Sequence, residues 1–235
     1  EESVCKKILA ALESERMANT VELNDEERKM AKQLYTENSA FKAAVDEVDA
    51  LIACCRHVFT PLLVQTTMAH IIALLAVTGM RIGEVLRLHP PDINRGQGTV
   101  LIRANKHGPD RLVPLHSTTV QALTEYETSP ARRAACPRPD GPLFVTVRGE
   151  AYQRTTVEAH FQRLRHAAGL TWQGPPPSLH DLRHTFATRQ MIRSYTTDGA
   201  DPAATLSLLA TWLGRLPAHP RVATPEDPAS SRFGE

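Results

Sequence analysis

Several basic side chains in the C-terminal third of the chain fall on one predicted helix and could handle a phosphate group. Within the segment from Ser178 to Thr188, His180 and Arg183 are three residues apart, so a helix places them on one face. A guanidinium can bind two phosphate oxygens at once, and an imidazole can move a proton near neutral pH. This pairing suits phosphoryl chemistry, although a chance His-x-x-Arg spacing explains the motif when it is taken alone. His184, one turn further on, is interpreted as a helix-packing histidine.

A second basic residue, Arg81, follows the helix break at Thr78-Gly79 and therefore stands near a predicted helix start. A helix start is a favourable environment for phosphate, because its backbone N–H groups have no partner within the helix. Glu84, three residues later, could orient a neighbouring basic group. The alternative interpretation is an ordinary surface Arg–Glu pair, which contributes little to stability.

The third candidate is Lys106, in the turn Lys106-His107-Gly108-Pro109-Asp110. A lysine on such a turn could reach into a cleft and donate a proton to a leaving alkoxide. The alternative is a solvated turn lysine with no chemical role.

The elements that must position these residues are mostly helical. The periodicity and the capping signals predict two strands, 99–103 and 111–115, that form a β-hairpin around Lys106. A further short strand is predicted over 143–145, and the proline-rich stretch 129–142 is predicted to be a loop. The predicted fold class is mainly α with a small antiparallel β-hairpin or sheet (α+β). The predicted helices cover residues 4–18, 24–35, 39–52, 60–77, 81–88, 118–126, 154–168, 180–194 and 202–213.

Charge and composition narrow the classes of protein. The net charge is +1, but residues 1–60 carry −4 and residues 61–235 carry +5, so the basic part is compatible with a phosphate-rich partner. No run of about 18 apolar residues exists, so no membrane span is expected. The four cysteines and the histidines show no zinc-ligand spacing, and the thiols are expected to be reduced in a cytoplasmic protein. We expect neither a metal nor another cofactor.

Taken in order, these signals resemble the catalytic domain of the tyrosine recombinases, the phage integrase family. The resemblance covers residues 78–214 and includes the flanking apolar positions. It lies in the segments LLAVTGMRIGEVLRL, NKHGPDRLVPL, PLF, LHDLRHTFATR and Thr211-Trp212-Leu213-Gly214.

The resemblance implies strand breakage and rejoining in duplex DNA through a 3′-phosphotyrosyl intermediate, as used in site-specific recombination and integration. Arg81 and Arg183 would stabilise negative charge on the phosphate oxygens, and Lys106 would protonate the 5′-oxygen leaving group. His180 would assist proton transfer at the nucleophile. Glu84 and His184 match supporting positions, and Arg215 stands where the family usually has histidine. The resemblance also implies a homo-oligomer on DNA and association with the nucleoid.

The resemblance fails at the nucleophile, because none of the four tyrosines follows Gly214, where the family's order places it. Residues 215–235 hold four prolines and one aromatic residue, so we expect an irregular tail and hypothesise a truncation or a frameshift there. We expect three segments: a short helical segment over 1–58, an integrase-like catalytic domain over 59–214, and the tail over 215–235. The first segment does not match the family, and one interpretation is a remnant of a DNA-clamping domain.

Three functions therefore stay open at this point. The first is a site-specific recombinase of integrase or transposase type, which we expect to be inactive because no tyrosine follows Gly214. The second is a DNA-binding remnant that grips phosphate without cutting. The third is a non-enzymatic helical protein whose basic residues are solvated.

Overall fold

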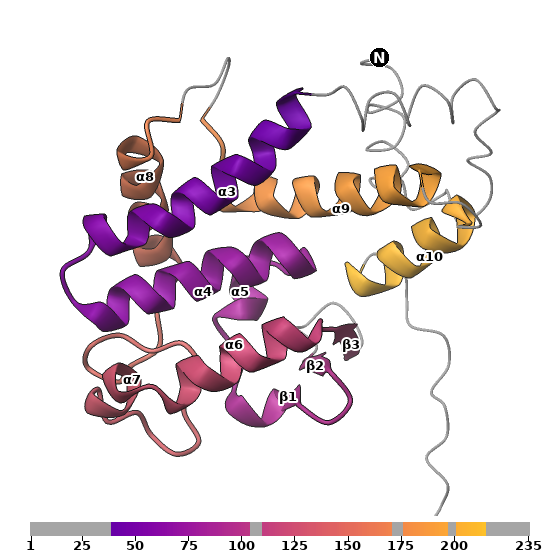
Figure 1. Cartoon of the computed structure of the whole chain (residues 1–235). Helices are drawn as coiled ribbons and strands as arrows, with labels where there is room; N and C mark the ends of the chain where they lie inside the picture. The colour runs from indigo at the N-terminus through magenta and orange to yellow at the C-terminus, as the bar shows by residue number, and fades with distance from the viewer. Residues whose placement is uncertain (1–38, 104–109, 171–175, 197–200, 215–235) are drawn as a thin grey trace, which may run out of the picture.

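The computed structural model describes residues 39–103, 110–170, 176–196 and 201–214 (Figure 1). Several predictions lie outside these residues: the helices over 4–18 and 24–35, the turn that carries Lys106, and the tail from 215 with Arg215. Among the described residues, no helix is long and apolar enough to cross a membrane.

A buried helix, α4 (Leu62–Thr78), lies at the centre of the fold. Its sequence is apolar on nearly every side, which is typical of a helix surrounded by other elements. It packs against α3 (Ser39–Val58), α6 (Ser117–Thr128) and α9 (Leu179–Thr196), and α3 also contacts α8 (Arg154–Ala167). The predictions for these helices are confirmed, with ends that differ by a few residues.

The predicted hairpin is also confirmed. Strands β2 (Thr99–Ile102) and β3 (Arg111–Pro114) pair antiparallel, with Val100 opposite Val113. A third strand, β1 (Ile93–Asn94), pairs with the other edge of β2 and was not predicted, because two residues show no periodicity. It follows the short 3₁₀-helix η1 (Pro90–Asp92).

Three predicted elements differ from the structure. The helix predicted over 81–88 is only α5 (Ile82–Val85), because the chain tightens into i→i−3 bonds such as Leu88 N–H to the Val85 carbonyl. The predicted loop 129–142 contains α7 (Pro130–Ala134), whose start is capped by the Ser129 hydroxyl. The strand predicted over 143–145 is reduced to one bridge, between Val145 and Ala151.

The chain near the site is organised by the last two helices. Helix α10 (Pro202–Trp212) packs on α9 and on β3, and its first turn is capped by the Asp201 carboxylate. Phe186 and Leu209 belong to a small core cluster between α9 and α10, separate from the main core around α4. The predicted fold class, mainly α with a small antiparallel sheet, is confirmed.

Candidate functional site

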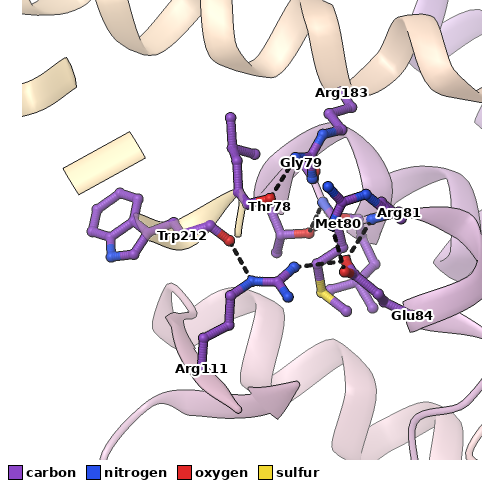
Figure 2. A network of polar contacts seen from close by, with 10 residues as sticks. Thr78, Gly79, Met80, Arg81, Glu84, Arg111, Arg183 and Trp212 are labelled. Carbon is purple, nitrogen blue, oxygen red and sulfur yellow. Dashed lines mark hydrogen bonds and ion pairs between the residues drawn. The ribbon is translucent and has the colours of Figure 1, made fainter. Parts of the chain in front are cut away.

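A buried carboxylate, that of Glu84, lies at the centre of the polar network in Figure 2. Its Oε1 accepts from Arg81 Nη1 at 3.0 Å, and its Oε2 accepts from the Arg81 backbone N–H at 2.8 Å. The same Oε2 accepts from Arg111 Nη2 at 2.7 Å. Burial alone would raise the pKa of Glu84, but the hydrogen bonds from Arg111 and from the Arg81 backbone, with both positive charges, hold that pKa below its ordinary value. Glu84 is therefore ionised near neutral pH.

Arg81 lies where this hydrogen-bond network reaches the solvent. It is the residue that precedes α5, and its side chain is 46% exposed, whereas that of Glu84 is 7% exposed. The short α5 thus begins with a guanidinium that one carboxylate oxygen tethers and that solvent still reaches. This arrangement restrains a positive charge at the surface, which is what binding of an anionic group requires.

Arg183, by contrast, is almost fully buried, with 4% of the residue exposed. From α9 its Nη1 donates to the Gly79 carbonyl at 2.8 Å, and its Nη2 donates to the Leu213 carbonyl at 2.6 Å. Figure 2 shows the side chain reaching from its helix to the loop that carries Gly79. Arg183 therefore joins the segment before Arg81 to the end of α10.

Gly79 makes the close approach at this junction possible. Its φ is +63°, the left-handed conformation that ends α4, and its N–H donates to the Leu75 carbonyl at 2.9 Å. A Cβ at this position would lie 2.4 Å from Cδ1 of Phe186 on α9. Glycine is thus required both by the backbone conformation and by the packing.

Arg111, on β3, is a member of the network that sequence reasoning missed. Its Nη2 donates to Glu84, and its Nε donates to the Trp212 carbonyl at 2.7 Å. Only 11% of its side chain is exposed. The segment NKHGPDRLVPL contains this arginine, but a strand residue followed by apolar neighbours gave no local signal of a partner 101 residues later.

The two histidines lie on α9, one turn apart. His180 is exposed and His184 is half-buried, and their rings meet edge to face at 4.6 Å between centroids. The start of α9 is fixed by Asp181, whose carboxylate accepts from the Ser178 backbone N–H at 2.7 Å and from its hydroxyl at 2.8 Å. His180 therefore lies at the exposed end of the helix that carries Arg183.

Of the predicted site residues, the structure brings Arg81, Glu84 and Arg183 into adjoining hydrogen-bond networks, while Lys106 and Arg215 lie outside the described residues. Within 39–103, 110–170, 176–196 and 201–214, no group of three or more His, Cys, Asp or Glu side chains is placed to hold a metal ion. One carboxylate facing two guanidinium groups leaves the Arg81–Glu84–Arg111 cluster with net positive charge. Chemically, this cluster can attract and orient an anion.

Comparison with protein families gives a match to the model of the phage integrase family over residues 42–198. Among curated proteins, the chain is 39% identical over 170 residues to y4rE, a candidate integrase/recombinase of Sinorhizobium fredii. That alignment covers 72% of this chain and 54% of y4rE. The chain is also 38% identical over 128 residues to the tyrosine recombinase XerC of Methylobacterium sp. (strain 4-46), covering 53% and 37% of the two chains. It thus spans about half the length, or less, of these relatives.

Solved structures with the same fold include XerA recombinase, with a TM-score of 0.53, 21% identity, and coverage of 90% of this chain and 80% of that one. XerH site-specific recombinase bound to its difH substrate gives a TM-score of 0.55 and 24% identity, over 72% and 45% of the chains. A lambda integrase tetramer bound to a Holliday junction gives 0.51 and 22%, over 90% and 64%. At these identities the likeness shows a shared fold.

Proposed function

The chain belongs to the phage integrase family, and from this premise we propose that it acts on duplex DNA in site-specific recombination of the tyrosine recombinase type. The observation that carries the proposal is the shared Glu84 carboxylate, which restrains Arg81 at the surface beside the loop held by Arg183. Fixed positive charge of this kind stabilises the extra negative charge that a phosphodiester gains in its transition state.

The roles proposed for the described residues follow from their places in the structure, and those of Lys106 and Arg215 follow from the family resemblance alone. Arg81 binds a non-bridging phosphate oxygen, because its guanidinium is both tethered and exposed. Arg183 adds buried positive charge beside the Gly79 loop and fixes that loop. His180, exposed one turn before Arg183, assists proton transfer. Lys106 protonates the 5′-oxygen leaving group, and Arg215 contributes a further donor to the phosphate. His184 supports His180 through their ring contact.

We propose duplex DNA and further copies of this chain as the partners. The support is the fold shared with XerH bound to difH and with the lambda integrase tetramer on a Holliday junction. The basic balance of residues 61–235 agrees with a partner that carries phosphates.

The DNA-binding part of the proposal is tested by fluorescence anisotropy with labelled duplex DNA over a range of salt concentrations. Affinity should fall steeply as salt rises, because each phosphate contact releases about 0.9 of a counter-ion. Arg154→Met serves as the matched loss of one positive charge, because Arg154 lies on α8 with 69% of its side chain exposed. Two results would contradict the proposal. One is an affinity for DNA that does not change with salt, and the other is an equal loss of affinity in Arg154→Met and Arg81→Ala.

A second candidate function is binding of DNA phosphates without cleavage of the DNA. It is supported by the burial and the contacts of the three tyrosines that the structure describes. Tyr126 is buried and its hydroxyl pairs with the Thr67 hydroxyl at 2.8 Å, and burial raises its pKa. Burial, with a smaller effect of Tyr126, raises the pKa of Tyr152 to about 12. Tyr195 packs against the cluster between α9 and α10. We therefore propose that none of these three tyrosines supplies the nucleophile, so that the described residues bind DNA phosphate without forming a phosphotyrosyl bond.

A pool of nicked suicide duplexes separates the two candidates. An active recombinase accumulates a covalent protein–DNA adduct that survives a denaturing gel, whereas a binding protein shifts the DNA in a native gel only. We expect the native shift without the adduct. An adduct that maps to any of the four tyrosines would establish cleavage by this chain and exclude the second candidate.

A further inference from the structure

Arg111 connects two parts of the site, the end of α10 and the buried Glu84 carboxylate. It donates from Nε to the Trp212 carbonyl at 2.7 Å and from Nη2 to Glu84 Oε2 at 2.7 Å, so one planar guanidinium spans the end of α10 and the carboxylate that tethers Arg81. The bond to Glu84 falls on the same oxygen that accepts the Arg81 backbone N–H at 2.8 Å. Arg111 and the Arg81 backbone N–H together therefore leave Oε1 for the Arg81 guanidinium.

The contact between Arg111 and Glu84 affects the charge and the exposure of the Arg81 guanidinium. Arg81 and Glu84 alone would form a neutral pair, and a carboxylate with both oxygens free can bind a guanidinium through two parallel hydrogen bonds. Such a pair would draw Arg81 toward the buried carboxylate and cancel its charge. With Arg111 and the Arg81 backbone N–H both on Oε2, the Arg81 guanidinium is bound through Oε1 only, and its side chain stays 46% exposed.

We propose that Arg111 is a positioning residue, which holds Glu84 so that the Arg81 guanidinium faces a DNA phosphate. Because Arg111 also binds the Trp212 carbonyl, the position of Arg81 depends on the packing of the end of α10. This inference rests on the proposed function, since it takes Arg81 to bind phosphate. Arg111 itself does not contact the phosphate, because only 11% of its side chain is exposed.

The opposite stem of the hairpin offers a matched control. Arg103, just after β2, donates from Nε at 2.9 Å and from Nη2 at 2.7 Å to Oδ1 of the buried Asp92. It is thus another Arg–carboxylate pair on the same hairpin, but Asp92 accepts in turn from the His89 backbone N–H and not from Arg81. Any effect of Arg103 on DNA binding should therefore be independent of Arg81.

The test is a double-mutant cycle read out by the salt dependence of binding to a labelled duplex of mixed sequence. Arg81→Ala should weaken binding by about tenfold and lower the salt slope by about 0.9, the value for one phosphate contact. Arg111→Met should give losses of similar size. The double variant should lose no more than either single variant, because both act on one contact. In the control cycle, Arg103→Met and Arg81→Ala should add.

Each outcome decides a separate point. Additive losses from Arg111→Met and Arg81→Ala, or an unchanged salt slope in Arg111→Met, would overturn the positioning role and leave the proposed function standing. A wild-type slope that Arg81→Ala does not alter would overturn the proposed function, and the positioning role with it. Non-additivity in the first cycle together with additivity in the control cycle supports the inference.

A variant that removes Arg111 leaves a buried carboxylate with one fewer partner, so its folding is checked by a thermal melt followed by circular dichroism. If Arg111→Met melts below the assay temperature, Arg111→Lys takes its place in the cycle. A lysine keeps the positive charge beside Glu84. Its compact ammonium group lacks the planar shape with which the Arg111 guanidinium reaches both Glu84 and the Trp212 carbonyl. It should recover part of the affinity and still fail to add to Arg81→Ala. Full additivity with Arg111→Lys would overturn the inference equally.

Discussion

Arg183 and Gly79 are joined by a 2.8 Å hydrogen bond from Nη1 to the carbonyl oxygen, although 104 residues separate them in the chain. The other Nη atom of Arg183 reaches the Leu213 carbonyl, so three distant segments meet at one buried guanidinium. The helix that carries the His-x-x-Arg motif therefore holds the loop that leads to Arg81. The stability of the fold and the affinity for DNA phosphate should therefore both depend on the Arg183 side chain.

Replacing Arg183 tests this dual dependence. Arg183→Met leaves the Gly79 and Leu213 carbonyls without their donor, and the unfolding free energy should fall by about 3 kcal/mol. Arg183→Lys should lose less, because one ammonium can satisfy one of the two carbonyls. Urea denaturation measures both, with Arg154→Met as the charge control, for which at most about 0.5 kcal/mol is expected. Equal stability of the Met variant and the wild type would contradict the bridging role.

Gly79 gives a prediction in which strain and packing can be separated. Gly79→Ala combines a φ of +63° with a Cβ that would lie 2.4 Å from Phe186, so a loss of about 2–4 kcal/mol is expected. Gly169→Ala is the matched control, because Gly169 has the same φ of +63° and nothing within 4 Å of the added Cβ. It should lose only the strain, about 1 kcal/mol.

The two alanine variants are compared by thermal melts. Equal losses in Gly79→Ala and Gly169→Ala would show that Phe186 moves away from the added Cβ at little cost, and would contradict tight packing between the Gly79 loop and α9.

Local spacing in the sequence was enough to predict part of this site. The i,i+3 relation of His180 and Arg183 and the Gly break before Arg81 are local signals, and the structure has both on the expected elements. The hairpin strands were predicted for the same reason, because alternation and turn residues are local.

The long-range partners could not be predicted in this way. Nothing in the order of residues indicates that Arg111 meets the Trp212 carbonyl or that Arg183 is buried, since both depend on how α10 docks on β3 and α9. The end of α5 was missed for a different, local reason, because its last turn is set by 3₁₀-type bonds and not by composition.

The ionised Glu84 gives a prediction for acid conditions. Its pKa in the folded state is lowered from the ordinary value of 4.5, so its ionisation stabilises the fold above that pH and the contribution disappears as the pH falls below it. The difference in unfolding free energy between the wild type and Glu84→Gln should be about 3 kcal/mol near neutral pH. Urea midpoints measured over a pH series should show this difference shrinking below pH 4.5. A difference that stays constant down to acid pH would show that Glu84 is not held in its charged form.

The most direct test of the central claim is a crystal structure of the chain bound to duplex DNA. We predict a backbone phosphate oxygen about 3 Å from the Arg81 guanidinium, with Glu84 still bridging Arg81 and Arg111 beneath it. DNA bound on another face, such as along α3 and α8, with Arg81 facing solvent, would contradict the assignment of this network as the phosphate-binding site.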